Sequence, residues 1–225
     1  MRERGIIFNA EMVRAVLEGR KTQTRRMLSP RQLKVIDAAS SIGECYPLES
    51  GHQHANSQSY YREWCPFGAV GDRLWVRETW QCTSFETNEY GHVEGVDYMR
   101  EIPKQKPHSP AWGVSYEANG FDTGDAEERG FPWRPSIHMP RWASRITLEI
   151  TGVRVERLNS ISEADARAEG IKASKPWSGL DGCVGSGGTP AAERFEALWQ
   201  SIYGVESWQA NPWVWVVEFK RVEGV

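Results

Sequence analysis

One short segment gathers most of the residue types that could do chemistry. GRKTQTRR, at residues 19–26, contains one lysine, two threonines and three arginines. A hydroxyl beside a base can act as a nucleophile, while guanidinium groups suit bidentate contact with phosphate. The segment therefore has three interpretations: a catalytic turn, a nucleic-acid contact, or a solvated strand edge.

A second segment, GDRLWVRETW at residues 71–80, combines cations with aromatic rings. Its apolar residues alternate with polar and aromatic ones, which is typical of a half-buried strand. Arginines on the outer face can contact phosphate, and an exposed tryptophan can stack on a nucleobase. The candidate binding residues of the two segments are Arg25, Arg26, Arg73, Trp75 and Arg77.

The arginines also have a structural interpretation that stays open, as strand-edge charges paired with Glu78 and Glu149. The chain has 27 basic and 30 acidic residues and a net charge of −3. Nonspecific phosphate binding needs an excess of positive charge on some face. Any contact with nucleic acid must therefore be local.

Cysteine spacing argues against a metal site. The cysteines lie at wide, unrelated spacings with no CxxC pair, so we expect reduced thiols. Structural zinc sites show tight paired spacings, which the soft ligands between residues 45 and 65 lack. We expect a polar loop here, with no bound metal. These ligands are Cys45, His52, His54 and Cys65.

The N-terminal sequence has no long apolar run. MRERGIIFNAEMV offers neither the apolar core of a secretion signal nor the length of a membrane span. We therefore expect a cytoplasmic protein that makes no membrane contact.

Signals for helices frame the first segment. Asn9 is suited to begin a short helix and Gly19 to end it, after which residues 21–28 should be extended. A second helix is expected from Ser162 to near Glu169, and a third after Thr189 as its N-cap.

Strands are expected between these helices. Alternating apolar residues predict strands over 71–80 and 145–158, while the terminal segment 211–222 is apolar on both faces through Val217, as in a central or barrel-closing strand. Because βαβ alternation is missing, the fold class is α+β, and the spacing suits a small, partly closed β-barrel with flanking helices. Residues 1–225 should form a single domain with an irregular insertion of loops and hairpins at about 83–133.

The motifs together resemble the ASCH domain family, whose fold is similar to the PUA barrel of RNA-binding proteins. The resemblance rests on GRKTQTRR after a helix, GDRLWV, LNSISEADARAEGI and the terminal WVWVVEFKRV, and covers roughly residues 5–30, 66–80 and 141–222. In length and in GDRLWVRETW, the chain looks most like ASCH proteins of bacteriophages and prophages. That resemblance implies the host cytoplasm as its location.

One branch of that family consists of small N4-acetylcytidine amidohydrolases, which use a lysine, a threonine and a glutamate. Matched residue by residue, these fall on Lys21, Thr24 and Glu169. The resemblance implies amide hydrolysis of an N4-acylated cytidine or a similar modified pyrimidine nucleoside, with no metal and no other cofactor.

The chemistry sets two conditions on these three residues. To act as a base near pH 7, Lys21 needs a pKa about three units below roughly 10.4, which requires burial or a neighbouring cation. Glu169 could then position the amine or protonate it. Residues three apart on a regular strand face opposite sides, so Lys21 and Thr24 can cooperate only if the chain still turns after Gly19.

Two other classes of function stay open. The same cleft could belong to a non-catalytic RNA- or DNA-binding module that holds a modified or flipped base. A lysine with a depressed pKa would favour the enzyme, and a solvated lysine beside a broad basic groove would favour the binding module. The third alternative is a protein partner bound through the 83–133 insertion. Neither the true substrate nor the oligomeric state follows from the sequence.

Overall fold

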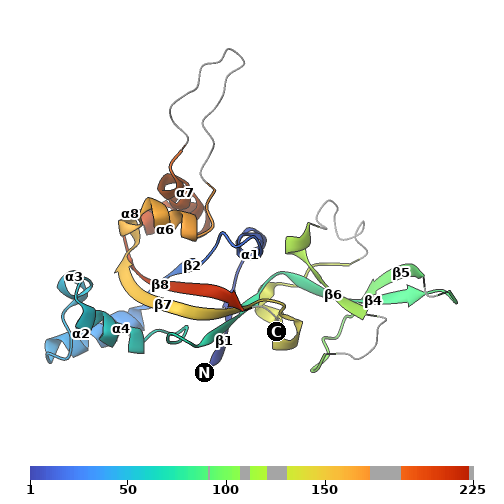
Figure 1. The fold of residues 1–225 in the computed structure, drawn as a ribbon, viewed down its shortest axis with the longest axis horizontal. Helices are drawn as coiled ribbons and strands as arrows, with labels where there is room; N and C mark the ends of the chain where they lie inside the picture. Colours follow the sequence, from blue (N-terminus) through green and yellow to red (C-terminus); the bar gives the residue numbers. More distant parts are fainter. Residues whose placement is uncertain (91, 107–111, 121–130, 173–188, 223–225) are drawn as a thin grey trace, which may run out of the picture. The chain divides into compact units, whose positions relative to one another are not determined.

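The computed structural model describes residues 1–90, 92–106, 112–120, 131–172 and 189–222 (Figure 1). These residues form a mixed α/β structure with a five-stranded sheet, a three-stranded sheet and several helices. The predicted mixture of helices and strands is therefore confirmed. No strand pairing that would close the larger sheet into a barrel is found among the described strands.

The chain divides into two compact units, which we describe separately. The first unit comprises Met1–Arg2, Glu18–Asp72 and Glu149–Lys220, and the second comprises Glu3–Leu17, Arg73–Leu148 and Arg221–Val225. The expectation of a single domain stays a prediction.

The larger sheet has the strand order β1-β3-β7-β8-β2. β1 runs parallel to β3, and β2 runs antiparallel to β8. The expected strands after Gly71 and at the C-terminus are thus both present. The strands are β1 (Glu3–Ile7), β2 (Gln23–Met27), β3 (Arg73–Arg77), β7 (Thr147–Arg157) and β8 (Trp213–Val222).

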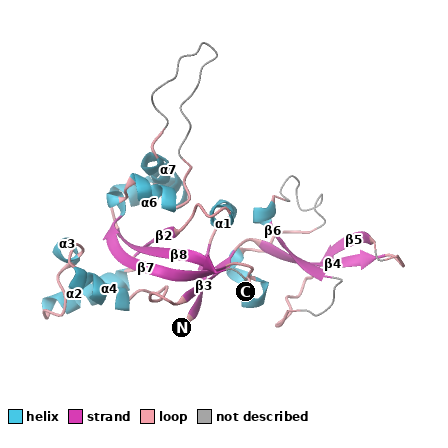
Figure 2. Ribbon diagram, in the orientation of Figure 1, coloured by secondary structure: helices cyan, strands magenta, loops and turns pink. Residues whose placement is uncertain are grey.

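In the first unit, α6 (Glu163–Ala168) and α7 (Ala191–Tyr203) lie over one end of β7 and β8 (Figure 2). Their apolar faces form one core with the strands, because side chains at helical spacing meet the inward residues of β8. Ser162 and Asp165 form the expected capping box at the start of α6. The core residues include Leu158, Ala166, Phe195, Trp199, Val214 and Val216.

The start of α7 differs from the prediction. The helix begins at Ala191 with Pro190 at the N-cap, rather than with Thr189 there. The carboxylate of Glu163 accepts hydrogen bonds from the backbone N–H groups of Ala191 (2.9 Å) and Ala192 (3.0 Å). A carboxylate from another helix therefore replaces the expected local cap.

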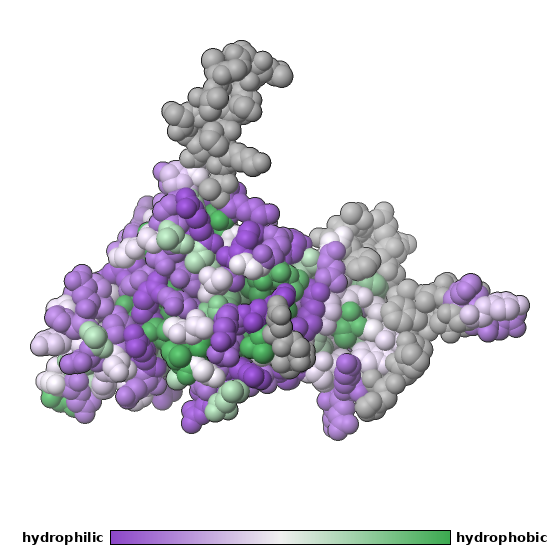
Figure 3. All heavy atoms as spheres, in the orientation of Figure 1, coloured by the Kyte–Doolittle hydropathy of each residue, from purple (hydrophilic) through white to green (hydrophobic). Residues whose placement is uncertain are grey.

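Three further helices of the first unit occupy a region that was expected to be partly a polar loop. They are α2 (Pro30–Ser41), α3 (Leu48–Gly51) and α4 (Ala55–Glu63), and they present mainly hydrophilic and intermediate residues on the face seen in Figure 3. Gln58 explains why the sequence pattern missed α4, since its side-chain amide bonds both backbone groups of Val155 (2.7 and 3.0 Å). A long-range contact, rather than local periodicity, stabilises this helix.

The second unit contains α1 (Ala10–Leu17), which begins after Asn9 as predicted, with the Asn9 side chain accepting a hydrogen bond from Met12 N (2.8 Å). The insertion is more regular than expected in its described part. There β4 (Trp80–Thr87), β5 (Val93–Tyr98) and β6 (Trp112–Tyr116) form an antiparallel sheet in the order β5-β4-β6. Residues 107–111 and 121–130 of the insertion lie outside the described residues.

Short 3-10 turns complete this unit. They are η1 (Glu117–Asn119), η2 (Ser136–His138) and η3 (Arg141–Ala143), while η4 (Leu158–Ser160) belongs to the first unit. A small core of Trp80, Cys82, Met139 and Ala143 packs beneath β4 and β6. No helix in the described part of the chain is long and apolar enough to cross a membrane.

Candidate functional site

Backbone bonding brings the segment GRKTQTRR to the end of α6. Gly19 has a φ of 74°, which suits glycine and turns the chain before Lys21. Lys21 then forms an isolated antiparallel bridge with Glu169, and Thr22 N donates to Ala168 O (2.8 Å). The turn thus ends before Lys21, whose backbone is already paired, and β2 follows from Gln23.

Lys21 and Glu169 form a buried ion pair. The Lys21 Nζ lies 2.7 Å from Glu169 Oε2 and 3.0 Å from the Glu169 backbone oxygen. The side chains are 1% and 4% exposed. Two of the three predicted catalytic residues, 148 positions apart, thus meet directly.

The second oxygen of Glu169 binds Arg25. Arg25 Nη1 lies 3.2 Å from Glu169 Oε1, and Arg25 Nη2 bonds Glu156 and lies 3.6 Å from Asp165 Oδ2. Arg25 was expected to contact substrate or nucleic acid. Instead, its guanidinium is buried among three carboxylates and holds Glu169 in place, so it is not available to an external phosphate.

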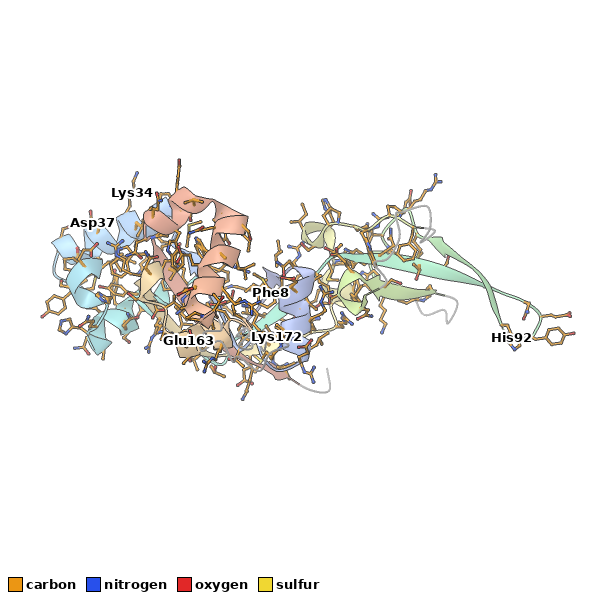
Figure 4. The ribbon with its side chains drawn as sticks, turned by 90° about the horizontal axis from the view of Figure 1, so that it is seen from above. Phe8, Lys34, Asp37, His92, Glu163 and Lys172 are labelled. Carbon is orange, nitrogen blue, oxygen red and sulfur yellow. The ribbon has the colours of Figure 1, made fainter. Side chains whose placement is uncertain are left out.

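More residues surround this pair than the sequence indicated. Gln23 Nε2 donates to Asp165 O (3.1 Å). Arg154 lies 3.1 Å from Glu156 and 2.9 Å from Asp165, and it also bonds Glu218. Asp165 thus joins the α6 cap to the ion-pair network. Figure 4 labels Glu163 at the start of α6 and Lys172 just beyond its end, which locates this region.

Burial lowers the pKa of Lys21, and the charges of Arg26 and Arg25 lower it further. The charge and hydrogen bond of Glu169 act in the opposite direction, but the net shift is downward. A lowered pKa increases the fraction of neutral amine, which is the form that can accept a proton. The pKa of Lys21 is therefore shifted in the direction that a base near pH 7 requires.

Thr24 is placed differently from the other two candidates. Gln23 and Arg25 both reach toward α6, so the intervening Thr24 faces the opposite side of β2. The Thr24 side chain is buried. The structure thus brings Lys21 and Glu169 into contact and places Thr24 on the other face of β2.

The remaining candidates belong mainly to the second unit. Arg73, Trp75 and Arg77 alternate with the buried Leu74 and Val76, as predicted. The Arg77 guanidinium carbon lies 5.3 Å from the centre of the Trp75 ring, a cation–π distance.

Glu78 and Glu149, the partners proposed for these arginines, pair with other cations. Arg145 binds Glu78 through two bonds of 2.9 and 3.0 Å, and Lys220 lies 3.0 Å from Glu149. Arg26, of the first unit, is partly buried, and its Nη1 lies 3.4 Å from the Arg25 backbone oxygen.

The segment between residues 45 and 65 uses its soft ligands for packing. The His52 ring contacts Trp213 at 5.2 Å between ring centres, and the His54 ring contacts Tyr46 at 5.0 Å, both in tilted arrangements. Among the described residues, no group of three or more His, Cys, Asp or Glu side chains is arranged to hold a metal ion.

Comparison with known proteins gives little beyond the structure. No family model and no curated protein matches the sequence. The crystal structure of an ASCH domain from Lactobacillus crispatus JV V101 is similar over 98% of this chain and 79% of that chain, with 14% identity and a TM-score of 0.35. Neither the identity nor the TM-score is high enough to transfer a property, so the ASCH resemblance and the phage origin stay predictions.

Proposed function

We propose that the chain is a metal-independent amidohydrolase acting on an N4-acylated cytidine or a similar modified pyrimidine nucleoside. The observation that carries this proposal is the buried contact of 2.7 Å between Lys21 Nζ and Glu169 Oε2. Buried, strongly perturbed ionisable groups concentrate at functional sites. The reaction class itself comes from the resemblance to the N4-acetylcytidine amidohydrolases.

Lys21 is the proton-transfer group in this proposal. The neutral amine takes the proton of the Thr24 hydroxyl as that oxygen attacks the acyl carbon, and then gives the proton to N4 as the C–N bond breaks. Water releases the acyl group from Thr24 in the second half of the reaction. Because Thr24 faces the opposite side of β2, this step requires the chain at residues 21–24 to rearrange on substrate binding, so that the Thr24 hydroxyl comes within about 3 Å of Lys21 Nζ, directly or through one water.

Glu169 has a positioning role. Its two carboxylate oxygens accept hydrogen bonds from Lys21 and Arg25, which leaves it suited to orient the amine rather than to protonate the leaving group. Arg25 in turn fixes Glu169. The alternative of a non-catalytic binding module called for a solvated lysine, and Lys21 is 3% exposed.

The test is product analysis by mass spectrometry with a panel of N4-acylated and N4-alkylated cytidines. We expect the wild-type chain to release cytidine and the free acid from the acylated members only. Lys21→Met and Thr24→Val should each lower kcat at least 100-fold, while Thr24→Ser should retain activity.

Lys34→Met is the matched control, because Lys34 is an exposed lysine on α2 (Figure 4). It should turn over substrate like the wild type. Circular dichroism of each variant separates lost chemistry from lost folding. A folded wild-type chain that leaves the whole panel intact would overturn the proposal, and full activity in Thr24→Val would remove Thr24 as the nucleophile.

A further inference from the structure

The second unit contains a cavity of about 650 Å³, which the proposed hydrolysis does not use. Its volume lies within the range of about 300–1,000 Å³ that is typical of small-ligand sites. Its lining includes Lys104, Lys106, Arg141, Trp142, Ser144 and Thr147. Three of these six side chains are cationic, and none of the lining residues is acidic.

The two lysines supply the uncompensated charge. Arg141 is paired with Glu3 through two bonds of 2.8 Å, so its charge is largely balanced. Lys104 and Lys106 are exposed, and neither has a carboxylate partner within the described part of the chain. The cavity therefore carries local positive charge, although the whole chain has a net charge of −3.

The aromatic wall of the cavity is held rigidly. Trp142 Nε1 donates to Pro103 O (3.0 Å), which fixes the chain just before the two lysines against the indole. The Trp142 ring also meets Trp80 and Trp112 edge to face, at 6.1 and 5.9 Å between ring centres. The ring and the lysines are thus kept at one cavity.

We infer that this cavity binds a nucleotide, with phosphate at Lys104 and Lys106 and the base against Trp142. An ammonium group recognises phosphate as a compact charge, and an indole offers a stacking surface to any base. A simple anion such as phosphate would leave most of the volume and the aromatic wall unused. The ligand is either a free nucleotide or a nucleotide within single-stranded nucleic acid, which share this chemistry.

Binding is measured by isothermal titration calorimetry at low salt, with cytidine monophosphate, a ten-nucleotide single-stranded RNA, and a decameric polyglutamate. We expect the Lys104→Glu/Lys106→Glu variant to bind the nucleotide ligands at least tenfold more weakly than the wild type. The exposed positions of both lysines make loss of folding a minor concern. Trp142→Phe, which keeps an aromatic ring, should weaken binding less than the charge reversal.

Two controls separate this site from the hydrolytic one. Lys34→Glu reverses an exposed lysine of the first unit and should bind like the wild type. Lys21→Met should lose hydrolysis but keep nucleotide binding, while the Lys104→Glu/Lys106→Glu variant should keep hydrolysis of the free nucleoside.

The ligands separate the two sources. If cytidine monophosphate binds, the ligand of the cavity is a free nucleotide. If only the RNA binds, the ligand is a nucleotide within single-stranded nucleic acid. Either outcome supports the inference. Three outcomes would each overturn the inference of a nucleotide site. They are equal affinity for polyglutamate and the nucleotide ligands, no binding of either nucleotide ligand, and equal weakening of binding in Lys34→Glu and in the Lys104→Glu/Lys106→Glu variant.

Discussion

At the scale of residues, one ion pair that is costly to bury lies at the centre of the proposed site. Lys21 and Glu169 leave water almost completely, and Arg25 completes the group by binding the other oxygen of Glu169. Buried ion pairs seldom stabilise a fold relative to apolar residues of similar volume. A pair retained at this cost is consistent with a chemical role.

The ion pair leads to a prediction on stability. Glu169→Leu leaves a lysine buried without its counter-charge, so the free energy of unfolding should fall by about 3 kcal/mol. Combining it with Lys21→Met removes both charges and should restore most of that loss. Urea unfolding of Glu169→Leu, Lys21→Met and the double variant measures the interaction free energy between the two side chains. If Glu169→Leu lost less than about 1 kcal/mol of unfolding free energy, the pair would not be isolated from water.

The sequence predicted part of this site. The match to the family paired Lys21 with Glu169, and the two side chains are in contact. The chain turns at Gly19, but Lys21, Gln23 and Arg25 then share one face, so the turn does not bring Thr24 to the side of Lys21. The match did not indicate that Arg25 points inward. Gln23 and Arg25 alternate with Thr24, which shows that they share a face, but only the packing of α6 on β2 decides which face that is.

At the scale of elements, α6 and α7 show how one carboxylate can organise two helices. Glu163 begins α6 and accepts the first free N–H groups of α7. These backbone hydrogen bonds lower the pKa of Glu163 from its ordinary value of 4.5, with a further contribution from Arg167. The carboxylate is thus bound more favourably in its charged form.

The lowered pKa of Glu163 predicts the direction of a pH effect. The stabilisation is fully present above the unfolded pKa and is lost as the pH falls through the lower folded pKa. Glu163→Gln should lower the urea midpoint at pH 7, and its difference from the wild type should shrink below about pH 4.5. The control is Glu193→Gln, because Glu193 is an exposed glutamate in the first turn of α7 itself. An equal fall of the urea midpoint in Glu193→Gln would contradict the capping role of Glu163.

Elements with clear local signals were predicted better than those that depend on distant contacts. The helix after Asn9, the alternating strand predicted within residues 71–80 and the terminal strand are present in the structure. The α4 helix was missed, and β4, β5 and β6 were expected only as hairpins within an irregular insertion, because neither region shows a strong apolar period. Gln58 bonded to Val155, and the pairing of Trp112 with Ser84, are contacts that a local pattern cannot reveal.

At the scale of the whole molecule, the chain divides into two compact units, whereas the sequence predicts a single domain. A single domain is expected to unfold in one cooperative transition. The prediction of one domain can be tested on that basis.

Thermal and urea unfolding should therefore show one transition. Far-ultraviolet circular dichroism reports the sheet, and fluorescence reports tryptophans in both units, including Trp80 and Trp215. Their midpoints should coincide. Two separated transitions would show that the units fold independently.

The pH dependence of kcat/KM tests the central claim most directly, namely that Lys21 acts as a base held by Glu169. The rate for an N4-acylated cytidine should rise with pH through one ionisation below the ordinary lysine value of 10.5, because burial lowers the pKa of Lys21. In Glu169→Gln, the charge that raises this pKa is removed, so the rise should move to still lower pH. Two results would contradict a base role for Lys21. One is a rise of kcat/KM at the same pH in Glu169→Gln as in the wild type, and the other is a rise only near the ordinary lysine pKa.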